Sequence, residues 1–185
     1  MANKTIRVGI LGCGNVGSAL AVRLIENREE ILTRTGVEFQ VVSIGVNDLS
    51  KKRDARIEIS LLTDDLICIV SSDCMDIVVE AMGGVEPAGD LIAKALTNHK
   101  PVVTANKELI AAESSSLFDL ARENSVDLLF EAAVGGGVPI IRPLRESLAG
   151  ENIRSIAGII NGTTNYVLTR MTEDSVSIED AIRDA

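Results

Sequence analysis

The sequence predicts an α/β fold in which a parallel β-sheet is covered by helices on both faces. Short apolar runs alternate with segments of helical periodicity along most of the 185 residues, and this alternation is typical of a parallel sheet. Aromatic residues make up only 2% of the chain, so the core must consist of aliphatic side chains, which suit strands buried on both faces. A glycine-rich turn follows the first apolar run directly.

Six apolar runs are expected to form the strands of this sheet. They are residues 6–11, 39–46, 77–82, 101–104, 127–133 and 153–160. Helices are expected over residues 16–32, 87–97, 106–124 and 143–150, with a helical, amphipathic tail over residues 163–185. Pro87 suits a first helical turn, and Asn106 can cap a helix start. Pro139 indicates a turn before the helix that begins near Pro143. The polar and basic residues 47–56 predict a loop.

The overall charge and the cysteines exclude several classes of protein. The net charge of −9 repels nucleic acids and anionic membrane surfaces, so neither partner is expected. Cys13, Cys68 and Cys74 are odd in number and form no metal-binding pattern, so we expect neither a disulfide framework nor a zinc site. Free thiols indicate a reducing compartment, and we expect a cytoplasmic protein. The first apolar run is too short for a signal sequence or a membrane span.

A glycine motif lies between the first expected strand and the first expected helix. Residues 12–17 read Gly-Cys-Gly-Asn-Val-Gly and match G-x-G-x-x-G, which in this position is typical of a Rossmann-type dinucleotide-binding domain. The first glycine would allow the tight turn, the second the approach of a pyrophosphate, and the third close packing of helix and strand. Amides at the helix start would attract the phosphates. The predicted cofactor-binding residues here are Gly12, Gly14, Asn15, Val16 and Gly17. The alternative is a glycine-rich turn without a ligand.

The residues after the second expected strand should contact the ribose of the adenosine. An acidic residue there favours NAD, and a basic residue favours NADP. The chain offers Asp48 for a ribose hydroxyl and Lys52, within the Lys-Lys-Arg run 51–53, for a 2′-phosphate. A solvated loop is the alternative for both, so the sequence leaves the choice between NAD and NADP open. We interpret Cys13 as a small buried filler, or alternatively as a thiol shielded by bound cofactor.

Lys107 lies where the fourth expected strand meets the next helix. A cation in a first helical turn opposes the helix dipole at a cost of about 0.3–1 kcal/mol, and this position falls at the sheet edge where α/β proteins bind ligands. Both observations favour a lysine that binds substrate or cofactor, or moves a proton. Gly83, in the turn after the third expected strand, is also assigned to the cofactor. His99 is interpreted as a solvated loop residue, and Glu86 as a carboxylate that stabilises its helix.

Five stretches of the chain together resemble homoserine dehydrogenase, the family that interconverts homoserine and L-aspartate 4-semialdehyde. They are GILGCGNVGSAL, VVEAMGGVEPA, VVTANKELIA, FEAAVGGGVPIIRPLRESLAG and GIINGTTNYVLTRM. The resemblance implies an NAD(P)-dependent oxidoreductase of threonine, methionine and isoleucine biosynthesis that is a homodimer when full length. It also implies that Lys107 lies beside the nicotinamide and the substrate. The family often has arginine where this chain has Asn47, which leaves the 2′-phosphate question open.

The resemblance further implies a metal site. Several members of the family hold sodium or another monovalent cation in a loop that corresponds to residues 131–138. Carried over to this chain, the ligands are Glu131, Val134, Gly136 and Val138. Oxygen ligands from a glycine-rich loop suit a hard cation. The alternative is a hinge whose glycines only form a turn.

The expected organisation is a dinucleotide-binding domain over residues 1–150 followed by the start of an α+β substrate and dimerisation domain over residues 151–185. We expect this second domain to be incomplete and the chain truncated, because the family's substrate-binding carboxylates and second lysine would follow residue 185. The chain alone is therefore expected to bind NAD(P) with little or no turnover. Two alternatives are another NAD(P)-dependent amino-acid dehydrogenase and a non-catalytic dinucleotide-binding module.

Overall fold

The computed structural model describes residues 4–159 and 161–185. The chain forms two compact units, Met1–Ala133 and Val134–Ala185, which are considered separately. Within the described ranges, no helix has both the length and the apolar character needed to cross a membrane.

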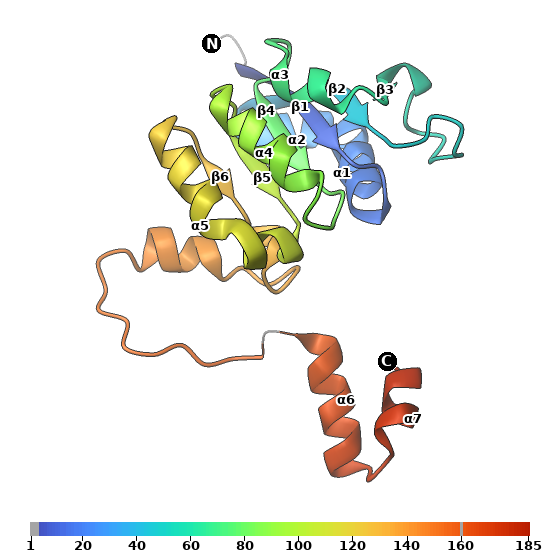
Figure 1. Ribbon diagram of the computed structural model, residues 1–185, viewed down its shortest axis with the longest axis vertical. Coiled ribbons are helices and arrows are strands. Elements are labelled where there is room, and N and C mark those ends of the chain that lie inside the picture. Colours follow the sequence, from blue (N-terminus) through green and yellow to red (C-terminus); the bar gives the residue numbers. More distant parts are fainter. Residues whose placement is uncertain (1–3, 160) are drawn as a thin grey trace. The chain divides into compact units, whose positions relative to one another are not determined.

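The first unit is built on a six-stranded sheet (Figure 1). Its strands are β1 (Lys4–Leu11), β2 (Val37–Gly45), β3 (Leu62–Thr63), β4 (Ile77–Glu80), β5 (Val102–Thr104) and β6 (Leu128–Leu129). All neighbouring strands are parallel, and their order is β3-β2-β1-β4-β5-β6. β2 and β3 therefore lie on one side of β1, and β4, β5 and β6 follow one another on the other side. This is the strand order of a dinucleotide-binding domain, and the predicted doubly wound Rossmann-type sheet is confirmed.

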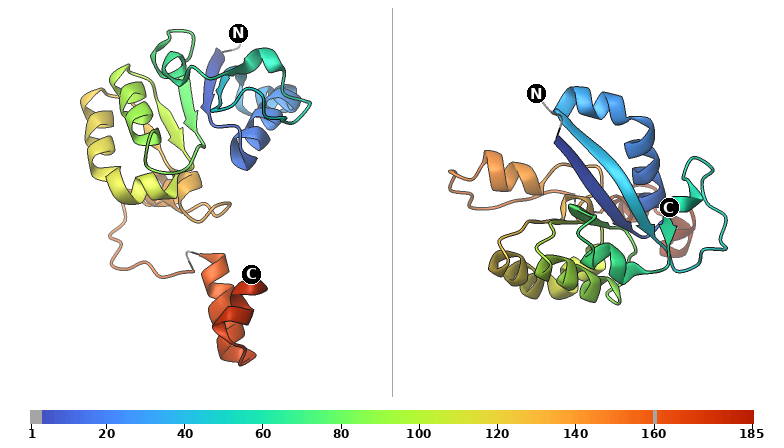
Figure 2. Two further views of the ribbon diagram at one scale, coloured as in Figure 1. Left: turned by 45° about the vertical axis from the view of Figure 1, so that its right-hand side comes forward. Right: turned by 90° about the horizontal axis from the view of Figure 1, so that it is seen from above.

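Helices cover both faces of this sheet (Figure 2). They are α1 (Asn15–Glu26), α2 (Arg28–Thr35), α3 (Leu66–Ser71), α4 (Ala88–Thr97) and α5 (Lys107–Glu123). One apolar cluster joins α1 to one face of β1 and β2, and a second joins α3, α4 and α5 to the opposite face. Successive strand residues divide between the two clusters: Val78 belongs to the second, whereas Val79 packs against the first. This alternation follows from the twofold period of a strand.

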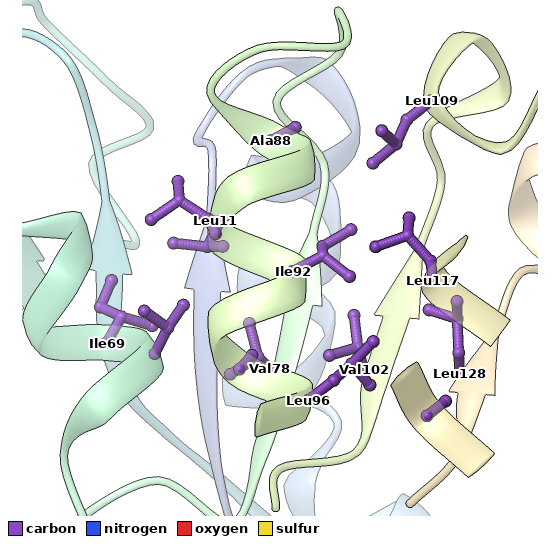
Figure 3. Close-up of a cluster of buried hydrophobic side chains, with 14 of the residues drawn as sticks. Leu11, Ile69, Val78, Ala88, Ile92, Leu96, Val102, Leu109, Leu117 and Leu128 are labelled. Atoms are coloured by element: carbon purple, nitrogen blue, oxygen red, sulfur yellow. The ribbon is translucent and has the colours of Figure 1, made fainter. Parts of the chain in front are cut away.

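Helix α4 lies at the centre of the larger cluster (Figure 3). Four of its side chains, Leu91, Ile92, Ala95 and Leu96, expose 4% of their surface or less. They recur at helical spacing, so one face of the helix is apolar. Full burial of one leucine or isoleucine contributes about 1.5–3 kcal/mol. This packing holds α4 on β4 and β5 and thereby fixes the carboxyl ends of both strands.

The region predicted as one helix over residues 16–32 is two helices that meet at Asn27, so the prediction of a continuous helix is wrong there. The backbone of Asn27 has φ −98° and ψ 19°. Its side-chain amide donates a hydrogen bond to the Glu30 carboxylate at 3.2 Å. A short polar side chain that bonds locally competes with helix formation, which explains the break.

Three short elements of the sheet unit also differ from the sequence prediction. The sequence predicts neither β3 nor α3, because elements of two and six residues carry too little periodicity to be recognised. The strand predicted over residues 127–133 is confirmed only as β6, and Glu131–Ala133 form a 3₁₀ turn. β6 pairs with β5 only through Val102 and Val103, and a strand without a neighbour loses its ladder hydrogen bonds.

The second unit contains a π-helix at Pro143–Ser147 and two α-helices, α6 (Gly162–Glu173) and α7 (Ile178–Arg183). The helical tail predicted from the sequence is therefore confirmed as two helices. Arg170 of α6 forms ion pairs with Asp174 at 3.2 Å and with Asp184 at 3.1 Å, and Ala181 of α7 is fully buried. The pair with Asp184, at the end of α7, joins the two helices, whereas Asp174 is the C-cap of α6 itself.

The strand predicted over residues 153–160 is wrong for residues 153–159, which have no regular structure, and residue 160 lies outside the described residues. The apolar pattern consists of Ile153, Ile156 and Ile159, which expose 43%, 67% and 70% of their surface. A strand needs a hydrogen-bonding neighbour, and the described part of this unit contains no other strand. The functional boundary at residue 150 stays a prediction.

Candidate functional site

A cleft of about 350 Å³ lies at the carboxyl ends of β1, β2 and β4. Most of its lining comes from the loops that follow these three strands, together with the end of β2 at Gly45 and the start of α3 at Leu66. The lining residues are Gly12, Cys13, Gly14, Gly45, Val46, Asn47, Lys51, Arg53, Leu66, Ala81, Met82 and Gly83. The strand order reverses between β1 and β4, and ligands of open α/β sheets bind at such a switch point. The cleft therefore occupies the position where a ligand is expected.

The glycines of the 12–17 loop leave almost no room for side chains at two positions. Gly12 has φ +98°, and a Cβ on it would lie 2.7 Å from the Ala81 carbonyl oxygen. Its amide donates to the carbonyl of Gly45 at 2.9 Å, which joins the ends of β1 and β2. A Cβ on Gly17 would lie 2.0 Å from the Gly12 carbonyl oxygen. These two glycines allow α1 to begin directly against the end of β1.

The start of α1 is open toward the cleft. Gly14 is the N-cap residue, no side chain of the described residues caps this helix, and its first turn holds no acidic residue. A Cβ on Gly14 would meet no atom within 4 Å among the described residues. The first amides of a helix have no partner within the helix, so those of Asn15 and Val16 are available to an anion. The helix dipole adds a partial positive charge there.

A second cleft of about 740 Å³ continues from the first and shares Cys13, Gly14, Lys51 and Arg53 with it. Its cationic lining consists of Arg23, Lys51, Lys52, Arg53 and Arg56, and its acidic lining of Glu26 and Asp54. Arg56 pairs with both carboxylates, at 3.2 Å to Glu26 and 2.7 Å to Asp54. Hydrogen bonds from Arg56 lower the pKa of Asp54 to about 2, so Asp54 is ionised at neutral pH. The remaining cations give this cleft a local excess of positive charge.

Asp48 lies outside the lining of both clefts. Its Oδ1 accepts hydrogen bonds from the hydroxyl and the amide of Ser50, at 2.6 and 2.8 Å. Both bonds lower the pKa of the Asp48 carboxyl, and the bond from the Ser50 hydroxyl has the larger effect. The carboxylate shapes its own loop, as short acidic side chains commonly do in turns. Its role at a ribose stays a prediction.

The edge formed by β4 and β5 carries polar groups in a largely apolar surrounding. Glu80 ends β4 and Thr104 ends β5, and both are fully buried. Asn106 caps α5, as predicted, by accepting a hydrogen bond from the Leu109 amide at 3.1 Å. Glu80 is absent from the predicted site. The signal available in the sequence is a charged residue inside the apolar run Ile-Val-Val-Glu-Ala-Met.

Lys107 is the first residue of α5 and is exposed at the carboxyl end of β5. Gly83 has φ +80° and lines the first cleft. His99 is exposed, and its Nδ1 lies 3.0 Å from the Asn124 carbonyl oxygen. Glu86 is exposed and precedes Pro87, the N-cap of α4. The functional roles assigned to these residues stay predictions.

The predicted metal loop crosses the boundary between the two units, with Glu131 in the first and Val134, Gly136 and Val138 in the second. Across the described residues, no group of three or more histidine, cysteine, aspartate or glutamate side chains is arranged to hold a metal ion. The predicted ligands are backbone carbonyls, so the absence of such side-chain clusters does not test them, and the cation site stays a prediction. Within the second unit, the Val138 amide donates to the Gly135 carbonyl at 2.8 Å and closes a turn.

Two protein-family models match the chain. The family model described as the homoserine dehydrogenase NAD-binding domain matches residues 12–131, and the one described as homoserine dehydrogenase matches residues 139–185. The chain belongs to the homoserine dehydrogenase family. Residues 12–131 contain the glycine loop, both clefts and Lys107, so the candidate site lies in the NAD-binding domain of this family. The second matched region lies wholly within the second compact unit.

Individual members of the homoserine dehydrogenase family agree with this assignment. The enzyme of Mycobacterium tuberculosis strain H37Rv is 46% identical over 183 residues, which cover 98% of this chain and 41% of the relative. The Synechocystis enzyme is 42% identical, covering 96% of this chain and 41% of the relative. This chain thus spans about two fifths of the length of these curated relatives.

Solved structures of the same family superpose on the chain. The homoserine dehydrogenase of Thiobacillus denitrificans has a TM-score of 0.89 at 43% identity, covering 98% of this chain and 42% of that chain. A hyperthermophilic archaeal homoserine dehydrogenase in complex with NADPH has a TM-score of 0.75 at 32% identity, covering 98% and 60%. The fold of the chain is therefore that of the family.

Proposed function

We propose that the first unit binds NAD(P) and that the full-length protein uses it to interconvert homoserine and L-aspartate 4-semialdehyde. The observation that carries the proposal is the cleft at the β1/β4 switch point, lined by the glycine loop, in a chain of the homoserine dehydrogenase family. Oxidation moves a hydride from C4 of homoserine to the nicotinamide and releases the hydroxyl proton, which leaves an aldehyde. The nicotinamide supplies the hydride acceptor.

The glycine loop would hold the pyrophosphate. Gly14 leaves open space beside the backbone, and the amides of Asn15, Val16 and Gly17 start α1. The Gly12 turn brings these amides to the end of β1. Charge on the phosphates is favoured there because the helix dipole and the free amides act together.

The basic cleft would hold the ribose end of the cofactor. Lys51, Lys52 and Arg53 line it, whereas the Asp48 carboxylate is engaged with Ser50. A 2′-phosphate would neutralise part of this positive charge, and Asp48 lies outside the lining of both clefts. We therefore propose that NADP(H) is preferred to NAD(H).

The nicotinamide end would lie toward β4 and β5. Gly83 lines the cleft on that side, and Lys107 is exposed at the neighbouring strand end. We assign to Lys107 a hydrogen bond to the substrate oxygen, which would stabilise negative charge as the aldehyde is reduced. A role in binding the substrate would also explain why a lysine occupies a first helical turn, where its charge opposes the helix dipole.

Further properties of the family are proposed for the full-length protein. They are a monovalent cation such as sodium at Glu131, Val134, Gly136 and Val138, a homodimer, and a cytoplasmic location. The donors carried over from the resemblance are the backbone carbonyls of these four residues, and oxygen donors of this kind suit a hard cation. The cation would neutralise charge and order the loop. The proposed domain division remains residues 1–150 and 151–185.

Cofactor binding tests the first half of the proposal on the 185-residue chain itself. Calorimetric titration should give saturable binding of NADPH and weaker binding of NADH. Turnover of homoserine by this chain alone should stay at background. Absence of binding by either cofactor would leave a module whose glycine loop has another use.

Turnover tests the second half on the full-length protein. Homoserine should be oxidised much faster than other amino alcohols or amino acids, whereas a different preferred substrate would indicate another amino-acid dehydrogenase. Lys107→Ala should lower kcat by about 10²-fold, the range found for removal of one oxyanion donor. Lys94→Ala, an exposed lysine in the last turn of α4, is the matched control and should leave kcat unchanged. Equal rates for the two variants would remove Lys107 from the mechanism.

A further inference from the structure

Glu80 is a buried carboxylate with no assigned function. It is the last residue of β4 and exposes 0% of its surface. Burial of an isolated carboxylate is strongly unfavourable, so a buried one is expected to have a full set of hydrogen-bond donors. A carboxyl group whose burial costs free energy, at the carboxyl edge of the sheet, is a candidate for a functional role.

The turn after β4 and the segment that joins β5 to α5 both donate hydrogen bonds to the Glu80 carboxyl group. From the turn after β4, the amides of Met82 and Gly83 donate to Oε1 at 2.7 and 3.3 Å. From the neighbouring strand, the Thr104 hydroxyl donates to Oε2 at 2.5 Å, and the Asn106 side-chain amide lies 3.5 Å from Oε1. All four groups donate, so both oxygens of the buried carboxyl group have hydrogen-bond partners. The bond from the Thr104 hydroxyl is the shortest of the four.

The same network continues to the start of helix α5. The backbone amide of Asn106 donates to the Thr104 hydroxyl oxygen, with a nitrogen–oxygen distance of 3.0 Å. The side chain of Asn106 then bonds in two directions: its oxygen accepts from the Leu109 amide at 3.1 Å, and its nitrogen donates to the Gly84 carbonyl at 2.6 Å. The turn after β4 and the first turn of α5 are therefore joined through one set of buried polar groups. Glu80 and Thr104 face each other in the strand register.

We propose that Glu80 is a positioning residue that holds the 82–84 turn and the start of α5 in one frame. The inference rests on the proposed function, in which Gly83 borders the cofactor and Lys107 contacts the substrate. Lys107 directly follows Asn106 and is the first residue of α5. The network therefore sets the position of Lys107 relative to the 82–84 turn. Reacting groups need their geometry held closely, because a misplacement of about 1 Å can cost 10²-fold in rate.

Hydrogen exchange tests the coupling without any ligand. Thr104→Val keeps the shape of the side chain but removes the hydroxyl between Glu80 and Asn106. The loss of one such hydrogen bond should raise the exchange rates of the Met82 and Leu109 amides by about tenfold each. The control is Val78→Ala, which cuts a fully buried side chain on the same strand and should raise exchange throughout the core. Faster exchange at Met82 with an unchanged Leu109 would overturn the proposal.

Kinetics of the full-length protein tests the positioning role. Glu80→Ala should lower kcat by about 10- to 100-fold with less than threefold change in KM for homoserine. Glu80→Gln keeps an oxygen for the turn amides and a nitrogen that can donate to Thr104, so it should restore at least a third of the rate. Val78→Ala should keep the wild-type kcat at a temperature where it is folded. Equal kcat for Glu80→Ala and Val78→Ala would reduce Glu80 to a structural role and overturn the proposal.

The two readouts separate the failure of this proposal from the failure of the proposed function. A wild-type protein that binds no NADPH and oxidises no homoserine overturns the proposed function, and the positioning role with it. Coupled exchange at Met82 and Leu109 would then survive only as a feature of the fold. Normal turnover with uncoupled exchange overturns the role of Glu80 alone.

Discussion

Replacing Gly17 with alanine would place a methyl group where the backbone of the glycine loop already lies. The new Cβ would be 2.0 Å from the Gly12 carbonyl oxygen, whereas ordinary carbon–oxygen contacts are about 3.3–3.6 Å. Helix α1 or the loop must therefore move by roughly 1.3 Å to reach even the shorter of these distances. The loop resists this movement because the Gly12 amide is bonded to the Gly45 carbonyl at 2.9 Å.

The free energy of unfolding should fall by about 2 kcal/mol or more in Gly17→Ala. Overpacking of a close contact costs about 1–3 kcal/mol and occasionally more, and here both contacting atoms belong to elements held by backbone bonds. The higher helix propensity of alanine offsets only about 1 kcal/mol of this loss in stability. Thermal unfolding should therefore begin several degrees lower, and NADPH affinity should fall because α1 moves away from the loop.

Gly14→Ala is the matched comparison for this prediction. A Cβ on Gly14 meets no described atom within 4 Å, so the substitution should change stability by less than about 1 kcal/mol, the scale of an N-cap preference. The methyl group would occupy the space proposed for the pyrophosphate and should weaken NADPH binding at least tenfold. Calorimetry and thermal unfolding on both variants separate folding from binding. A Gly17→Ala protein with unchanged stability and affinity would refute the steric reasoning.

Three further predictions concern other parts of the first unit. Asn106→Ala should lower the free energy of unfolding by about 1–2 kcal/mol through loss of the cap, measured by urea denaturation. Asn106→Asp should not recover this loss, because its second oxygen would face the Gly84 carbonyl and the Glu80 carboxyl group, which now bond the Asn106 nitrogen. Lys52→Ala and Arg53→Ala should each weaken NADPH binding in calorimetry while NADH binding stays the same; equal losses for both cofactors would contradict a 2′-phosphate site. The pair of Arg7 with Asp76 holds the pKa of Asp76 at about 2, below its ordinary 3.8. A lowered pKa adds stability that is fully present above the ordinary value and is lost as pH falls through the folded value of about 2. Arg7→Ala should therefore be less stable than wild type at pH 7, and the difference should shrink steadily between about pH 4 and pH 2; a difference as large at pH 2 as at pH 7 would contradict the assignment.

Local pattern was sufficient for the elements whose signals lie within a few neighbouring residues. The cap at Asn106 was predictable because its partner, the Leu109 amide, is three residues away. The glycine loop was recognisable because a strand, a turn and a helix follow one another within residues 4–26. The aliphatic runs that became β1, β4 and β5 were recognisable because strands buried on both faces are apolar throughout.

Local sequence pattern gave wrong predictions in two situations. In one, a strand depends on a neighbouring strand from elsewhere in the chain; in the other, a single side chain competes with helix formation. Residues 153–159 carry the apolar spacing of a strand but have no neighbouring strand in the described part of their unit. β3 has only two residues, and it exists because β2 offers it a parallel edge at Ile44 and Gly45. The helix break at Asn27 comes from one side chain that bonds to Glu30. A periodicity over ten or more residues does not detect any of these effects.

The sequence by itself determined the fold class, the glycine loop and the place of Lys107 at a helix start, because each is set by residues adjacent in the chain. The tertiary structure alone decided the basic lining of the second cleft and the surroundings of Glu80. Glu80 meets Thr104 and Asn106 across sequence separations of 24 and 26 residues. They are neighbours because β4 and β5 pair in parallel and end at the same edge of the sheet.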